Sequence, residues 1–167
     1  MIVVIIVGVL ATLAVYGVRQ YVRASKTSEV TGMITSIQAA EEAYRDETTA
    51  YLNVSGDLTS GTPYPDVPGT WKMAWPNTGH GDNPRWMALG VQPSGPVRYG
   101  YLCVAGAAGQ TPPNPPDAGT TFNWATVSAT EPWYVIVGMG DLDGDGTYSK
   151  YIASSFTTEV YSYLPKE

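Results

Sequence analysis

The sequence predicts an α+β protein in which a long N-terminal α-helix, about 50 residues, packs by its second half on a C-terminal antiparallel β-sheet. The first eighteen residues, MIVVIIVGVLATLAVYGV, carry no charge, and no proline interrupts the chain before Pro63. A one-sided apolar stripe with helical spacing follows them. The remainder holds most of the 18 Gly, 13 Pro and 12 Tyr, a composition typical of a turn-rich β domain.

Residues 1–24 form the first predicted segment, a protruding hydrophobic helix. Its first eighteen residues would extend about 27 Å as a helix, close to the ~30 Å hydrocarbon core of a bilayer. Val, Ile and Leu surround its whole circumference, so we expect it to lie in lipid or among other apolar helices. It lacks a basic n-region and is longer than the usual apolar region of a signal peptide, which argues against a cleaved signal peptide. In an ordinary membrane anchor, Arg19, Arg23 and Lys26 would place the rest of the chain in the cytoplasm.

An amphipathic pattern predicts that the helix continues over residues 25–51. Apolar positions recur at spacings of 3, 4, 3 and 4, and a last one follows a heptad later. We interpret this stripe as the face that packs on the sheet, and Glu41 and Arg45, which lie off it, as an exposed i,i+4 ion pair. The packing residues are Val30, Met33, Ile37, Ala40, Tyr44 and Tyr51.

The rest of the predicted globular domain, 25–167, divides into a connection and a sheet. Residues 52–96 are rich in Gly, Pro and Asn and hold Trp71, Trp75 and Trp86, so we expect a loop packed against the domain. Residues 97–167 form the β-sheet region, where short connections favour an antiparallel meander. The strand from Trp133 is apolar on both faces and should be central. The expected strands are Val97–Ala105, Thr121–Ser128, Trp133–Met139, Tyr148–Ser154 and Thr157–Tyr163.

Charge and motif content argue against several classes of function. The formal net charge of −6 disfavours nucleic acid as the principal partner. Cys103 is the only cysteine and is predicted to be a small buried side chain. His80 has no second histidine with which to form a zinc site. No nucleophile or phosphate-loop motif occurs, so we expect no enzymatic activity and no cofactor other than the metal considered below.

The first eighteen residues resemble the N-terminal helix of type IV pilins and related pseudopilins. In that family the mature chain begins six residues earlier, and a glutamate would lie two positions before Met1. We therefore expect the true start to lie upstream. Residues 43–52, AYRDETTAYL, are similar to the helix end of many members. GDLDGDGTYSKY followed by FTTEVYSY is similar to the closing hairpin of some. Tyr16 stands where many members have a helix-kinking proline.

The resemblance implies a subunit that waits in the bacterial inner membrane. Assembly machinery would then move it into an extracellular helical filament of identical subunits, the pilus, whose core is these helices. The filament would serve surface adhesion, motility or uptake. The residues implied in assembly are Met1, Ile2, Val3, Val4, Gly8, Ala11, Ala14, Tyr16 and Gly17.

Two other functions remain open from the sequence. One is a pseudopilin of a type II secretion system or a minor pilin. The other, of a different class, is a membrane-anchored periplasmic binding or adhesin domain, for which exposed Trp71 and Trp75 would supply contacts.

One local motif indicates a possible Ca²⁺ site. Asp141, Asp143 and Asp145 occupy positions 1, 3 and 5 of an EF-hand-type loop, with Gly146 next and the Thr147 carbonyl at position 7. Ile152 stands where that loop needs a bidentate glutamate, so the affinity would be weak. The alternative is a plain Gly/Asp turn between two strands.

Overall fold

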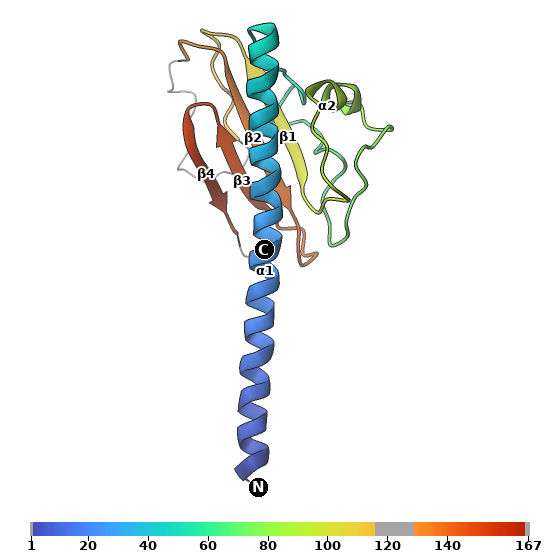
Figure 1. Ribbon diagram of the computed structural model, residues 1–167, viewed down its shortest axis with the longest axis vertical. Helices are drawn as coiled ribbons and strands as arrows, with labels where there is room; N and C mark the ends of the chain where they lie inside the picture. Colours follow the sequence, from blue (N-terminus) through green and yellow to red (C-terminus); the bar gives the residue numbers. More distant parts are fainter. Residues whose placement is uncertain (1, 116–128, 166–167) are drawn as a thin grey trace.

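The protein consists of a long helix that carries a globular part at its C-terminal half. In this computed structural model, residues 2–115 and 129–165 are described. Helix α1 (Ile2–Thr48) runs along the molecule, and the sheet and loops lie against one side of its upper half only (Figure 1). The other elements are α2 (Asn83–Leu89), β1 (Gly100–Gly106), β2 (Trp133–Gly140), β3 (Ser149–Ser154) and β4 (Thr157–Tyr163).

The sheet is an antiparallel meander with strand order β1-β2-β3-β4. Its register aligns Leu102 with Val137, Val137 with Ile152, and Ile152 with Tyr161. Every residue of β2 is buried, so the central position predicted for this strand is confirmed. The strand expected at 121–128 lies outside the described residues.

Alternating side chains of the strands build two apolar clusters, one on each face of the sheet. The face toward α1 includes Tyr101, Cys103 and Ile136. The opposite face includes Leu102, Val135 and Val137. Both faces are apolar because each is covered, which explains the near-continuous hydrophobic runs of β1 and β2.

The predicted helix of about 50 residues is wrong in its extent. Only residues 24–48 lie beside the globular part, and residues 2–18 are exposed throughout. The helix ends at Thr48, so Tyr51 lies beyond it. Thr49 adopts a left-handed conformation, with φ of 66°. Its N–H donates to the Arg45 carbonyl at 2.7 Å, and the Thr48 hydroxyl donates to the Tyr44 carbonyl at 2.8 Å. These bonds satisfy carbonyls of the last turn and end the helix before Tyr51.

The connection between α1 and β1 packs on the domain and contains α2, which the sequence reading did not predict. Pro84 lies in the first turn of α2, and Gly90 ends it with a φ of 78°. Trp86, fully buried, stacks on Tyr64 with ring centroids 5.4 Å apart. Trp75 meets Tyr64 edge-on at 4.5 Å. An aromatic cluster therefore anchors this connection to the sheet.

By length and hydropathy, none of the helices in the described part of the chain qualifies as a membrane span.

Candidate functional site

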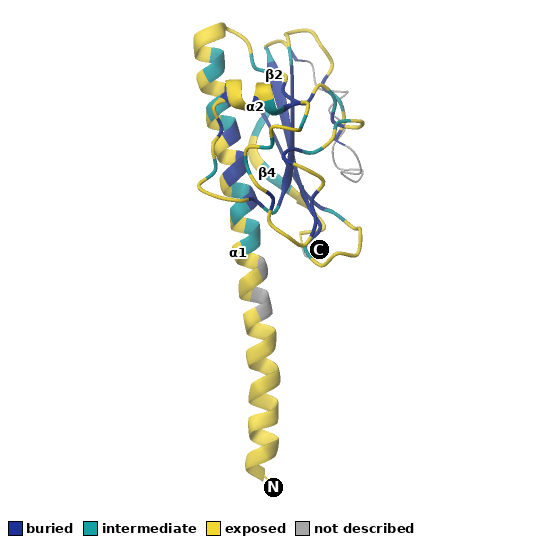
Figure 2. Ribbon diagram, turned by 90° about the vertical axis from the view of Figure 1, so that its right-hand side faces the viewer, coloured by how far each residue is buried: buried dark blue, intermediate teal, exposed yellow. Residues whose placement is uncertain are grey.

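The N-terminal part of α1 is the largest exposed apolar surface among the described residues. We call Ile2–Val18 the apolar arm. Every residue of the arm is exposed, and its large apolar side chains range from 75 % exposed at Ile2 to 52 % at Ile6 (Figure 2). Of the residues expected in assembly, all but Met1 belong to this arm, and Met1 lies outside the described residues. Soluble monomers rarely leave a contiguous apolar surface of this kind in water, and such surfaces mark sites of interaction with proteins or membranes.

The face of α1 that points away from the sheet continues the arm with small side chains. The exposed positions between residues 24 and 43 hold one carboxylate, Glu42, and otherwise only small residues. Small side chains allow another helix to approach closely. These small residues are Ala24, Ser25, Ser28, Gly32, Thr35, Ser36, Ala39 and Ala43.

The predicted packing stripe of α1 is largely placed on the sheet. Val30, Met33 and Ile37 are buried, and Ala40 and Tyr44 pack against the same cluster. Tyr51 also packs there, but from the turn after the helix, where it meets Tyr134 edge-on at 4.8 Å. Ile34, fully buried, belongs to this face although the sequence reading left it out.

The environment of Glu41 differs from the one predicted from the sequence. Its carboxylate is fully buried between α1 and β1, whereas an exposed ion pair with Arg45 was expected. It accepts hydrogen bonds from the Leu52 N–H at 2.9 Å and from the Cys103 thiol at 3.2 Å. Burial raises the pKa of Glu41 from 4.5 to about 7. Arg45 instead lies 3.6 Å from Glu131 and 3.8 Å from Glu42.

The helical spacing contains the signal that identifies Glu41. Position 41 follows Ile37 by four residues and therefore lies on the same face of α1.

Burial also raises the pKa of the Cys103 thiol well above its usual range. A thiol that is buried and held protonated is a poor nucleophile, which agrees with the prediction that Cys103 is a small buried side chain.

The three aspartates of the β2–β3 turn lie together. Oxygens of Asp141, Asp143 and Asp145 all fall within 4.8 Å of one another, so the group could hold a metal ion. The turn already uses both Asp141 oxygens, which accept the Gly144 N–H at 2.7 Å and the Gly146 N–H at 3.1 Å. Ile152 is buried in β3 and cannot supply a ligand. The cluster fits a three-carboxylate Ca²⁺ site only in part, and the calcium site stays a prediction.

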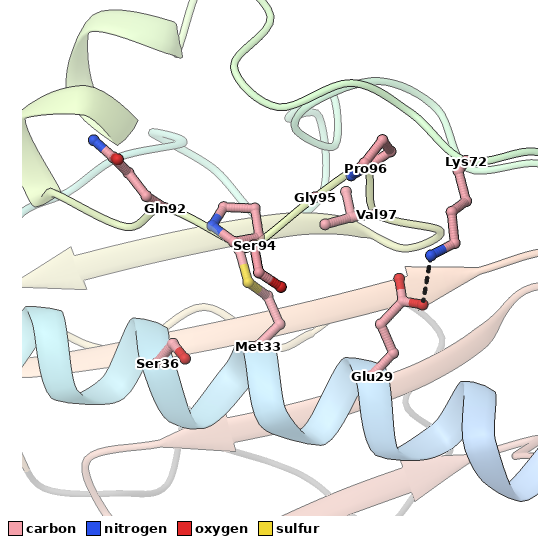
Figure 3. A pocket seen from close by; sticks show the side chains of 10 residues that line it. Glu29, Met33, Ser36, Lys72, Gln92, Ser94, Gly95, Pro96 and Val97 are labelled. Atoms are coloured by element: carbon pink, nitrogen blue, oxygen red, sulfur yellow. Dashed lines mark ion pairs between the residues drawn. The ribbon is translucent and has the colours of Figure 1, made fainter.

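A cleft opens where α1 enters the globular part. We call it the basic cleft; its volume is about 280 Å³, and it is lined by Lys26 and Glu29 of α1 together with Lys72 and Arg98. Figure 3 shows Lys72 reaching from the loop toward Glu29, with a nitrogen–oxygen distance of 3.9 Å. Glu29 also accepts the Arg98 backbone N–H at 2.7 Å. Three cations thus face one partly neutralised carboxylate. A neighbouring pocket of about 570 Å³ extends along α1 past Met33 to Ser36.

The tryptophans considered for adhesion differ in their environment. Trp71 is 66 % exposed, while Trp75 belongs to the aromatic cluster and donates its indole N–H to the Val91 carbonyl at 3.0 Å. Only Trp71 therefore presents its ring to a partner.

Comparisons with protein-family models, with curated proteins and with solved structures found no match to this chain.

Proposed function

We propose that this protein is a structural filament subunit of the type IV pilin kind, which polymerises through its apolar arm. The observation that supports the proposal best is the arm itself, whose side chains are exposed on all sides while the globular part has a complete core of its own. A helix that is apolar around its whole circumference needs apolar neighbours on every side. Copies of the same arm supply such neighbours.

Apolar surface is more stable away from water, by roughly 25 cal/mol for each Å² buried, so the arm needs apolar surroundings. Before assembly, the same surface needs another apolar environment, and an inner membrane with its assembly machinery is the one implied by the resemblance. Moving the arm from apolar surroundings into a bundle of like helices keeps it away from water in both states. Contacts between single pairs of subunits can then remain weak, because each subunit meets several neighbours.

The proposal is tested by assembly of the full chain. The purified chain is held in detergent, the detergent is removed, and the sample is examined by electron microscopy and sedimentation. We expect fibres from the wild type. The Leu10→Arg variant places a charge on the arm and should remain as small particles, because a guanidinium in an apolar bundle is strongly disfavoured.

A matched control is Glu159→Lys, which changes an exposed side chain of β4 and should form fibres as the wild type does. The proposal fails if the wild type never forms fibres. It also fails if Leu10→Arg assembles normally. Single chains that stay bound to lipid vesicles would instead favour the membrane-anchored binding domain.

A further inference from the structure

We propose that the basic cleft of one subunit receives the acidic end of α1 from a second copy, so that subunits stack head to tail. This contact rests on the proposed filament function and deepens it by naming the residues that meet between subunits. It is carried by the charges at the two ends of the globular part and by the distance between them.

The acidic end is the last two turns of α1. Glu42, Asp46 and Glu47 are exposed there, and Glu131, 3.6 Å from Arg45, adds a fourth carboxylate. Arg45 is the cation placed among them. This end of the globular part therefore has an excess of negative charge.

The basic cleft lies at the opposite end of the globular part, where the arm begins. Its three cations, Lys26, Lys72 and Arg98, exceed its one carboxylate, Glu29, although the whole chain has a net charge of −6. Tyr21 and Val22 line its lower edge and join it to the arm. The opposite charges of the basic cleft and of the acidic end of α1 favour a head-to-tail contact, and repetition of such a contact produces a filament.

The aspartate turn also lies toward this end, since Gly144 approaches Thr70 and the Arg98 guanidinium donates to the Thr70 carbonyl at 3.1 Å. Its carboxylates do not line the cleft. Asp141 and Asp145 accept hydrogen bonds from the backbone of their own turn, which stabilises their charges locally.

The length of α1 makes this contact compatible with the arm. Lys26 and Asp46 are 20 positions apart, which corresponds to about 30 Å along a helix. With that offset, arm residues 2–18 of one copy lie beside residues 22–38 of the next. Those residues carry the small exposed side chains of α1, so the apolar arm can approach that face closely. A second copy can therefore supply carboxylates to the cleft and cover the arm in the same contact. A free anion or a lipid headgroup can supply only the negative charge.

Charge reversal tests the contact. We expect Lys26→Glu with Lys72→Glu, and separately Asp46→Lys with Glu47→Lys, each to raise the critical concentration for fibre formation about tenfold, as expected for several exposed ion pairs of opposite sign. The chain with all four substitutions should regain assembly. Glu159→Lys, in β4, is the single-charge control outside the cleft lining and outside the last two turns of α1. Lysines in the last turn of a helix are favourable to the helix, so the second pair should leave the fold intact, as a thermal melt would verify.

The outcomes separate this contact from the proposed function. Wild-type fibres that are insensitive to both reversals, or no recovery in the fourfold variant, would overturn the contact and leave the filament function standing. If the first pair abolishes binding to phosphatidylglycerol vesicles while fibres are unchanged, the cleft belongs to a lipid headgroup. A wild type without fibres would overturn both proposals.

Discussion

Glu41 shows how one residue links three parts of the fold. Its carboxylate lies between α1, the turn that holds Leu52, and Cys103 of β1. The groups that face it are the Leu52 N–H and the Cys103 thiol, and Glu42 adds a neighbouring negative charge on α1. Ionising a carboxyl in this place costs free energy because desolvation outweighs the two hydrogen bonds.

Glu41 should therefore make the stability of the protein depend on pH. Its pKa is about 7 in the folded state and 4.5 as the ordinary value, so the folded chain binds more protons between these values. The stabilisation is fully present below pH 4.5 and is lost as the pH rises through 7. The loss should be about 3 kcal/mol in the free energy of unfolding.

Urea unfolding of wild type and Glu41→Gln at several pH values measures this effect. The glutamine keeps an acceptor for the Leu52 N–H but cannot ionise, so the variant should lack the pH-dependent loss. Glu47→Gln, at an exposed position of α1, is the control. Equal pH profiles for wild type and Glu41→Gln would show that Glu41 does not titrate in this range.

Asp141 should matter to stability more than its two companions in the aspartate turn. Both of its oxygens accept backbone N–H groups, and both donors, Gly144 and Gly146, have positive φ angles of 84° and 86°. Asp141→Ala leaves those N–H groups without their partner and should lower the free energy of unfolding by about 2 kcal/mol. Asp143→Ala, at an exposed position, should change it by less than about 0.5 kcal/mol. Chemical denaturation of both variants decides, and equal losses would contradict this account of the turn.

At the scale of elements, the contact between α1 and β2 depends on the absence of a side chain. A Cβ added at Gly138 would lie 2.8 Å from Val30 Cγ2 and 3.5 Å from Ile34 Cδ1. Gly138→Val should therefore push α1 from the sheet and cost about 1–3 kcal/mol of stability. Gly81→Ala, where a Cβ meets nothing within 4 Å, is the control. Thermal melts compare them, and unchanged stability of Gly138→Val would mean that α1 can shift freely on the sheet.

The aspartate turn also makes a prediction about metal binding. With three carboxylates and no ligand from Ile152, Ca²⁺ should bind only in the millimolar range. Calorimetry of the full chain in detergent measures this, with Asp143→Ala as the variant that should lose the heat of binding. Absence of a heat of binding at millimolar Ca²⁺ would show that the aspartate turn is a structural turn and not a calcium site.

Periodicity was a good guide to elements and a weaker one to their ends. The apolar residues on both faces of β2 placed that strand at the centre, and the apolar stripe placed Val30 and Ile37 on the sheet. The stop at Thr48 depends on a left-handed Thr49, which the apolar periodicity does not reveal. Helix α2 has only seven residues and is held mainly by the burial of Trp86, so tertiary packing decides it. The basic cleft joins residues far apart in the sequence, and no local pattern predicts it.

At the scale of the whole molecule, the globular part and the arm have opposite requirements. The globular part buries its apolar residues on both faces of its sheet. The arm leaves its own exposed over its full length (Figure 2). The arm is therefore the surface that the proposed assembly would cover.

Energy transfer between labelled arms tests this claim most directly. Leu10→Cys accepts a fluorophore, while Cys103 is fully buried and shielded from labelling. Chains carrying donor and chains carrying acceptor are mixed in detergent, and the detergent is then removed. We expect strong energy transfer after the detergent is removed. Adding unlabelled wild type should weaken the transfer, and adding lipid vesicles should not abolish it. Absence of transfer, with each arm lying singly in lipid, would contradict it.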